Sequence, residues 1–289
     1  MARIAIIGGG NIGEALLSGL LRAGRQVKDL VVAERLPDRV KYLADTYSVL
    51  VTSVREAVDN ATFVVVAVKP ADVESAMSDL ANAAAESDGA DQVFVTVAAG
   101  ITITYFESRL PAGTPVIRAM PNAAALVGAG VTALAKGRYV TPQQLEEVSA
   151  LFDAVGGVLT VPETQMDAVT ALSGSGPAYF FLLVEALVDA GVAVGLSREV
   201  AAELTAQTMA GSAAMLLERM GQERRPADGE AFGPRVDTSA SQLRASVTSP
   251  GGTTAAALRE LERGGFRAAV DGAVQAAKTR SEQLRITSE

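Results

Sequence analysis

Hydrophobic positions in the first half of the chain form short continuous runs separated by helix-like patterns. The runs are rich in β-branched residues and lie at Arg3–Ile7, Leu30–Val32, Phe63–Val68, Val93–Val97, Val116–Ile117 and, more weakly, Val131–Leu134. The helix-like segments are Ile12–Arg22, Asp38–Thr46, Ala71–Ala85, Thr104–Arg109 and Pro142–Ala154. Strands that are covered on both faces are continuously apolar, so this alternation predicts a doubly wound parallel sheet in an α/β fold.

Beyond about Pro162 the pattern changes to long helical stretches without a convincing strand. These stretches are Met166–Leu172, Ala178–Val194, Arg198–Arg219, Thr254–Arg263 and Phe266–Leu284. The polar stretch Gly221–Thr238 is typical of a mobile loop. We therefore expect an α/β domain at residues 1–162 and an all-helical domain at residues 163–289. Several of these helices are apolar on more than one face, which predicts at least an obligate homodimer.

Composition then narrows the possible chemistry. The 289 residues carry a formal net charge of −8 and include no cysteine and no histidine. An acidic chain is poorly suited to neutralise phosphates, so nucleic acid is not an expected partner. Without those two residue types there is no disulfide, no thiolate nucleophile, no Ser-His triad and no Cys- or His-ligated metal site.

Targeting signals are not expected either. The longest uncharged stretches, Ala119–Ala135 and Ala168–Val184, are too short to span a membrane and contain proline or glycine. The N-terminal apolar run is too short for the apolar region of a signal peptide. We therefore expect a cytoplasmic protein.

The strongest motif is the glycine-rich segment that follows the first apolar run. Gly8, Gly10 and Gly13 give the pattern Gly-x-Gly-x-x-Gly, with Asn11 and Ile12 between the last two glycines. Glycines at these positions permit a tight turn, a close approach of the backbone to a pyrophosphate, and close helix–strand packing. The motif predicts a Rossmann-type dinucleotide-binding domain, the alternative being a glycine-rich turn without a ligand.

Residues after the second predicted strand bear on the choice of cofactor. Glu34 could accept hydrogen bonds from the ribose hydroxyls of NAD, whereas Arg35 favours the additional phosphate of NADP. Arg39 could join such a phosphate site. Either Glu34 or Arg35 could equally be a solvated surface charge.

Further candidates follow other predicted strands, at the edge where open α/β sheets bind ligands. Val68, Lys69 and Pro70 end one strand, and Lys69 could contact cofactor or substrate or simply extend into solvent. Val97 and Ala98 end the next predicted strand. Their small side chains would let a flat ring lie close, and the alternative is a tightly packed turn. Arg118, after a further strand, could equally form a structural ion pair.

Two motifs lie in the helical half. Ser173–Tyr179 is either part of a site or a helix junction. Ser249-Pro250-Gly251-Gly252-Thr253-Thr254 places hydroxyls and a Gly-Gly turn just before a helix, which suits a carboxylate. An ordinary threonine N-cap is the alternative there.

Together these motifs resemble the pyrroline-5-carboxylate reductase family over nearly the whole chain. The segments that carry the resemblance are Gly8–Gly13, Val68–Pro70, Ser173–Tyr179 and above all Val247–Thr254, in the family's order. The resemblance implies hydride transfer from NADPH or NADH to the C=N carbon of L-1-pyrroline-5-carboxylate, which gives L-proline. It also implies a helical domain that interlocks with a second subunit. NADPH is favoured by the family's habit and by Arg35 and Arg39.

The resemblance also implies roles for individual residues. Ser249, Gly252 and Thr253 would hold the substrate carboxylate, and the Thr254 hydroxyl would reach the ring nitrogen. Glu163 matches a family position near the substrate. Lys69 and Pro70, with Val97 and Ala98, would flank the nicotinamide. Such a reaction consists largely of positioning, so the absence of histidine and cysteine is no obstacle.

Two other functions remain open. A β-hydroxyacid dehydrogenase shares the two-domain plan but relies on a lysine in its helical domain, where this chain has only Lys278. A non-catalytic dinucleotide-sensing protein would keep Gly8–Gly13 but would not need the Ser249–Thr254 loop.

Overall fold

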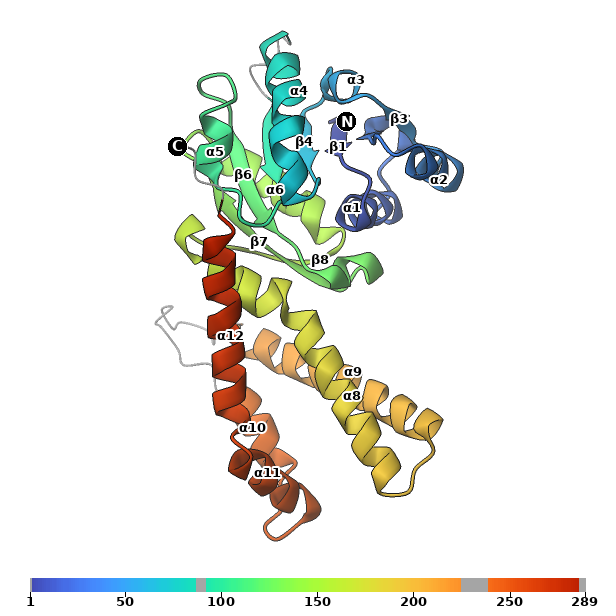
Figure 1. Cartoon of the computed structure of the whole chain (residues 1–289), viewed down its shortest axis with the longest axis vertical. Helices are drawn as coiled ribbons and strands as arrows, with labels where there is room; N and C mark the ends of the chain where they lie inside the picture. The colour runs from blue at the N-terminus through green and yellow to red at the C-terminus, as the bar shows by residue number, and fades with distance from the viewer. Residues whose placement is uncertain (1, 87–91, 225–238, 286–289) are drawn as a thin grey trace. The chain divides into compact units, whose positions relative to one another are not determined.

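The computed structural model describes residues 2–86, 92–224 and 239–285 (Figure 1). The strands are β1 (Ile4–Ile7), β2 (Leu30–Ala33), β3 (Leu50–Thr52), β4 (Phe63–Val66), β5 (Val93–Thr96), β6 (Val116–Met120), β7 (Gly130–Lys136) and β8 (Gly156–Thr160). The α-helices are α1 (Asn11–Arg22), α2 (Pro37–Tyr47), α3 (Val54–Val58), α4 (Val73–Glu86), α5 (Ile103–Glu107), α6 (Pro142–Asp153), α7 (Met166–Val169), α8 (Gly176–Ala193), α9 (Arg198–Arg224), α10 (Ser239–Ser246), α11 (Thr253–Arg263) and α12 (Phe266–Gln283).

The strands form one sheet in the order β3-β2-β1-β4-β5-β6-β7-β8. The first six have the order of a dinucleotide-binding doubly wound sheet and pair in parallel. The parallel α/β sheet expected from the sequence is thus confirmed. Strand β7 is an exception, because it runs antiparallel to β6. Only the short 3₁₀ helix η3 (Ala123–Val127) connects the two strands, and a parallel return needs a longer crossover.

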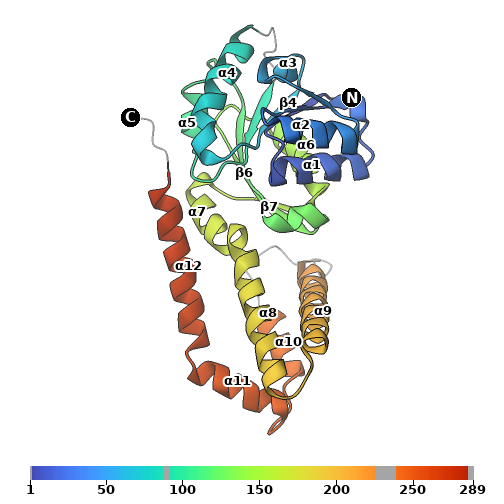
Figure 2. The same ribbon diagram turned by 45° about the vertical axis from the view of Figure 1, so that its right-hand side comes forward.

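Helices cover both faces of this sheet (Figures 1 and 2). Alternate residues of β1 show the division, because Ile4 and Ile6 pack in one apolar cluster and Ala5 and Ile7 in the other. Helices α1, α2 and α6 contribute Leu16, Leu17, Leu20, Leu43, Val148 and Phe152 to the first cluster. Helices α3, α4 and α5 contribute Ala57, Val58, Val73, Met77, Leu80, Tyr105 and Phe106 to the second. This covering explains why the strands are continuously apolar.

Two strands of the sheet, β3 and β8, are not among those predicted from the hydrophobic pattern. Strand β3 has only three residues, of which Leu50 is exposed. Strand β8 begins with Gly156 and Gly157, and glycine is poor in strands. Gly156 has a φ of +141°, and a Cβ added there would lie 2.0 Å from the carbonyl oxygen of Gly130. This close backbone approach requires glycine.

The described residues form two compact units, Met1–Pro177 with Val274–Glu289, and Ala178–Ala273. The first unit therefore extends past the boundary expected at residue 162. Met166 and Ala171 lie in the continuation and are fully buried. The last part of α12 also belongs to the first unit, a long-range contact that sequence patterns do not reveal.

The second unit consists of helices, as the sequence predicted, and few of its side chains are buried. Val188 and Ala201 are its buried apolar residues in the part of the chain that the structure describes. Helix α9 continues to Arg224, so the first four residues of the loop expected at Gly221–Thr238 are helical instead. Residues 225–238 of that stretch lie outside the described residues.

Residues Glu163–Ala193 form one continuous helical stretch. By length and composition alone it could cross a membrane, although the sequence was expected to contain no such stretch. The stretch begins with the charged residues Glu163 and Asp167 and continues through the apolar part of α8.

Candidate active site

The glycine-rich turn joins β1 to α1 with little room for side chains. Gly8 has a φ of +103°, and a Cβ added there would lie 2.8 Å from the carbonyl oxygen of Ala67. A Cβ on Gly13 would lie 2.0 Å from the carbonyl oxygen of Gly8. Both glycines are therefore needed to bring the turn, the start of α1 and the end of β4 together.

The N-terminus of α1 is open toward a ligand. Gly10 is its N-cap and provides no side-chain hydrogen bond, and a Cβ added there would meet no atom within 4 Å. The first-turn N–H groups of Asn11, Ile12 and Gly13 have no partner within the helix by geometry. Such a helix end binds a pyrophosphate, so this turn fits a dinucleotide.

Gly9 is held from both sides by residues that follow β2. Glu34 Oε2 accepts the N–H of Gly9 at 2.9 Å, and Arg39 Nε donates to the Gly9 carbonyl at 2.6 Å. The other carboxylate oxygen of Glu34 accepts the N–H groups of Arg35 at 2.7 Å and Leu36 at 2.9 Å. The carboxylate of Glu34 thus accepts hydrogen bonds from three backbone N–H groups.

Arg39 is in turn held by Glu14 in the first turn of α1, with which it forms an ion pair. Tyr42 and Tyr47 donate their hydroxyls to Glu14 Oε1 at 2.9 and 2.8 Å. Burial acts to raise the pKa of the Glu14 carboxyl, but hydrogen bonds from these partners and the Arg39 charge lower it to below its ordinary value. Burial and the Glu14 carboxylate raise the pKa of Tyr47 to about 12.

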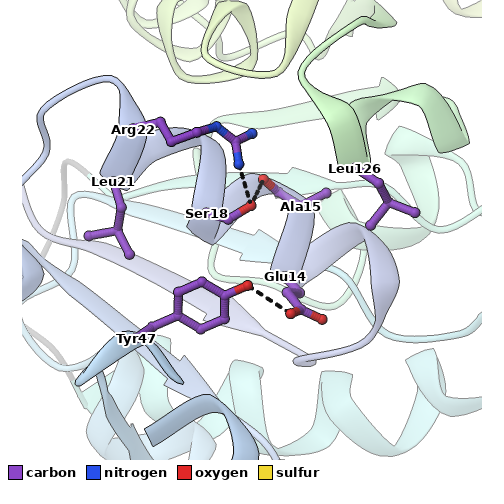
Figure 3. A pocket seen from close by; sticks show the side chains of 7 residues that line it. All are labelled: Glu14, Ala15, Ser18, Leu21, Arg22, Tyr47 and Leu126. Atoms are coloured by element: carbon purple, nitrogen blue, oxygen red, sulfur yellow. Dashed lines mark hydrogen bonds between the residues drawn. The ribbon is translucent and has the colours of Figure 1, made fainter. Parts of the chain in front are cut away.

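A shallow hollow beside this cluster is lined by Glu14, Ala15, Ser18, Leu21, Arg22, Tyr47 and Leu126 (Figure 3). Figure 3 shows Tyr47 pointing at Glu14 from one side, with Arg22 turned toward Ser18. The polar groups in this hollow are thus bonded to one another. It lies along the flank of α1, from Glu14 in the first turn to Arg22 in the last turn.

Arg35 is the more accessible of the two arginines after β2. Its side chain is 69% exposed and pairs with Asp72, whereas that of Arg39 is 26% exposed. An additional phosphate on the cofactor would therefore reach Arg35 more readily.

The predicted strand-end residues come together in the first unit. Val68, exposed Lys69 and Pro70 follow β4, and Val97 and buried Ala98 follow β5. The ends of these strands are aligned, because Val66 pairs with both Ile7 of β1 and Thr96 of β5. The structure thus brings these two segments and the glycine turn to one edge of the sheet.

Glu163 also belongs to the first unit, at the start of the 3₁₀ helix η4 (Glu163–Gln165). Its Oε1 accepts the N–H of Ile103 at 2.7 Å and lies 3.5 Å from Nη1 of Arg118. Arg118 is 3% exposed, and burial lowers the pKa of its guanidinium. Arg118 thus forms the structural ion pair that was one of its two expected roles, and its buried Nη2 has no partner among the described residues.

A second charged group, around Asp167, was not found from the sequence. Asp167 is buried and accepts hydrogen bonds from Ser281 at 2.7 Å and from Nε of Arg285 at 2.7 Å. Because 118 positions separate Asp167 from Arg285, no local pattern signals this contact.

The Ser173–Tyr179 motif lies within the continuous helical stretch. A π-helical turn, η5 (Thr170–Gly174), is closed by the N–H of Ser175 donating to the carbonyl of Thr170 at 2.8 Å. A Cβ on Gly174 would lie 2.7 Å from Met120 at the end of β6. The motif is therefore a modified helical turn against the sheet, a feature frequent at functional sites.

The Ser249–Thr254 loop lies in the second compact unit, whereas Lys69 and Glu163 lie in the first. Gly251 has a φ of +72°, and Gly252 donates its N–H to the Ser249 carbonyl at 3.0 Å. Gly252 is the N-cap of α11 and has no side-chain hydrogen bond, so the expected alternative of a threonine N-cap is wrong. The N–H groups of the first turn remain available to an anion.

A sheet with the strand order of dinucleotide-binding proteins, a glycine-rich turn at its edge and a following helical domain match the plan of an NAD(P)-dependent oxidoreductase. In the part of the chain that the structure describes, no three His, Cys, Asp or Glu residues gather to hold a metal ion. Residues 3–100 match the family profile of NADP oxidoreductases described as coenzyme F420-dependent. Residues 163–284 match the profile of pyrroline-5-carboxylate reductase dimerisation.

Individual relatives agree with the second profile. Pyrroline-5-carboxylate reductase of Mycobacterium tuberculosis is 84% identical over 291 aligned residues, which cover 100% of this chain and 99% of the relative. The structure of the Coxiella burnetii enzyme has a TM-score of 0.86 at 34% identity and covers 99% of both chains. That of the Plasmodium falciparum enzyme with NADP bound has a TM-score of 0.80 at 27% identity, covering 99% and 98%. The chain belongs to the pyrroline-5-carboxylate reductase family.

Proposed function

We propose that this chain reduces L-1-pyrroline-5-carboxylate to L-proline, the last step of proline biosynthesis, with NADPH or NADH. The observation that carries the proposal is the 84% identity to a reductase of that name over the whole chain. The open N-terminus of α1 and the open N-terminus of α11 supply one anion site for the cofactor and one for a carboxylate.

The cofactor site consists of the residues at the carboxyl edge of the sheet. The N–H groups of Asn11, Ile12 and Gly13 would hold the pyrophosphate, which could approach because Gly10 has no side chain. Glu34 and Arg35 lie at the adenosine end. The segments Val68–Pro70 and Val97–Ala98 would hold the nicotinamide, which would supply the hydride.

The substrate site rests on the loop before α11. Ser249, Gly252 and Thr253 bind the carboxylate, and the Thr254 hydroxyl bonds the ring nitrogen, so that the imine carbon faces the hydride donor. We assign Lys69 and Glu163 to the same reaction, Lys69 as a charged group beside the nicotinamide and Glu163 near the substrate.

A homodimer accounts for the exposed apolar side chains of the helical half. Phe180, Phe181, Leu182 and Leu187 of α8 are at least half exposed in the single chain. All lie within the segment that matches the dimerisation profile. We therefore propose that a second subunit, and not a membrane, covers this helix, and that the protein works in the cytoplasm.

Oxidation of NADPH by the purified protein with L-1-pyrroline-5-carboxylate tests the reaction. We expect cofactor absorbance to fall in proportion to the L-proline formed. Tight NADPH binding with no turnover would support the dinucleotide-sensing alternative. Turnover of 3-hydroxy acids with NADP⁺ in place of the imine would support the β-hydroxyacid dehydrogenase alternative.

A further inference from the structure

Glu34 occupies the position where dinucleotide-binding proteins carry an acid that bonds the ribose hydroxyls of NAD. In this chain its carboxylate already accepts three backbone N–H groups, from Gly9, Arg35 and Leu36. A carboxylate offers about four acceptor positions in all. At most one is left, which is too few for the pair of hydroxyls on a ribose.

The three bonds link the glycine turn to the segment after β2. The Gly8 N–H donates to the carbonyl of Ala33 at 2.8 Å, and the Gly9 N–H donates to Glu34 at 2.9 Å. On the other side of Gly9, Arg39 donates to its carbonyl at 2.6 Å. Both peptide groups of Gly9 are therefore oriented by charged side chains, directly before the N-cap of α1.

Arg39 is itself restrained. Glu14 forms an ion pair with it, and Tyr42 and Tyr47 donate to the same carboxylate. Packing also restrains the turn, because Gly9 lies so close to Leu43 of α2 that an added Cβ would be 2.4 Å from its side chain. The turn is thus held in one conformation before a cofactor arrives, and preorganisation of this kind lowers the cost of binding.

From these contacts we propose that Glu34 and Arg39 are positioning residues that orient the phosphate-binding turn through Gly9. They act on the part that NADH and NADPH share, so they do not select between the two. Selection rests on Arg35, whose exposed guanidinium pairs with Asp72. This inference rests on the cofactor site of the proposed function.

Direct binding of NADPH and NADH to the purified protein, followed by cofactor fluorescence without substrate, tests the proposal. This readout does not depend on turnover, so a failure of the proposed reaction would be seen separately. We expect Glu34→Gln to weaken the binding of both cofactors by the same factor, about tenfold, because the charge-assisted bond from Gly9 of the turn is lost. The matched control Glu147→Gln, on the exposed face of α6, leaves both affinities unchanged.

Arg39→Gln provides a second, independent variant. It also should weaken both cofactors equally, whereas an arginine that binds the additional phosphate would affect NADPH alone. In steady-state assays the KM for cofactor should rise in both variants while the KM for the imine stays constant, a split that general destabilisation does not produce. A loss confined to NADH in Glu34→Gln, a loss confined to NADPH in Arg39→Gln, or no loss at all would overturn the proposal.

Discussion

Thr254 is the residue on which the proposed chemistry depends most. It is the second residue of α11, one position after Thr253, and the N-cap of this helix is Gly252 without any side-chain bond. Its hydroxyl is therefore not required to cap the helix, and we expect it to bind the substrate. A role in stability and a role in catalysis can consequently be separated at this position.

Replacement of Thr254 by alanine should lower kcat/KM by roughly 5- to 150-fold, corresponding to the loss of one hydrogen bond of about 1–3 kcal/mol. Thr254→Ser should recover much of the activity because the hydroxyl returns. Steady-state kinetics and thermal melting of both variants check this. A lowered melting temperature with unchanged turnover would assign the hydroxyl to the helix instead.

Arg35 is the residue expected to distinguish the two cofactors. Its alanine variant should bind NADPH about tenfold more weakly, because a phosphate–guanidinium contact is lost, while NADH is nearly unaffected. Titration of each cofactor at low and moderate salt measures both effects. Equal losses for NADH and NADPH would show that Arg35 is an ordinary surface charge.

At the scale of elements, the buried Asp167 fastens the end of α12 to the first unit. Its bonds to Ser281 and Arg285 place the end of α12 and Leu284 against the turn after β5, where a Cβ on Gly100 would lie 2.7 Å from the Leu284 carbonyl. Burial acts to raise the pKa of Asp167, but the bonds from Ser281 and Arg285 and the nearby positive charges lower it to below its ordinary value.

Asp167→Asn should therefore reduce the free energy of unfolding by about 1–3 kcal/mol at neutral pH. A lowered pKa in the folded state stabilises the fold above the unfolded-state pKa of about 4 and loses this contribution as the pH falls through the folded value. The difference between wild type and variant should thus shrink below about pH 4. Urea unfolding at several pH values measures it.

Asp271→Asn is the matched control, since Asp271 is an exposed carboxylate on α12, the helix whose end Asp167 holds. Its unfolding free energy should follow that of wild type at every pH. A difference for Asp167→Asn that stays constant down to pH 3 would mean that the charge of Asp167 does not contribute.

At the scale of the whole molecule, the helical half leaves apolar side chains uncovered. Phe181 and Leu182 of α8 are 62% and 67% exposed in the single chain. Burial of one such side chain contributes roughly 1.5–3 kcal/mol, so a shared interface of several is strongly favourable. The protein should therefore have a mass in light scattering of at least twice the 29.7 kDa of one chain.

Leu182→Asp should shift this mass toward that of one chain, because a charge would be buried at the interface. Val127→Asp is the matched control, since Val127 is 79% exposed but lies outside the dimerisation segment. An active wild-type species near 30 kDa would contradict the homodimer.

The sequence by itself determined the features that depend on neighbouring residues. A continuous apolar run, three spaced glycines and a helical pattern predict β1, its turn and α1, because strand burial and backbone freedom are local properties. The Gly-Gly turn before α11 likewise predicts the start of that helix from neighbouring residues. Strands β3 and β8 could not be predicted, because β3 is short and β8 begins with glycines, so neither has a continuous run of apolar residues.

Only the tertiary structure decided which partner each charged side chain takes. From the sequence Glu34 is a candidate ligand of a ribose, whereas in the fold its carboxylate accepts a hydrogen bond from the N–H of Gly9, 25 positions earlier. Arg118 pairs with Glu163, and Asp167 pairs with Arg285 at a separation of 118 positions. The physical reason is that a charge removed from water must find a counter-charge or hydrogen bonds in space, and folding, not spacing along the chain, brings those groups within reach.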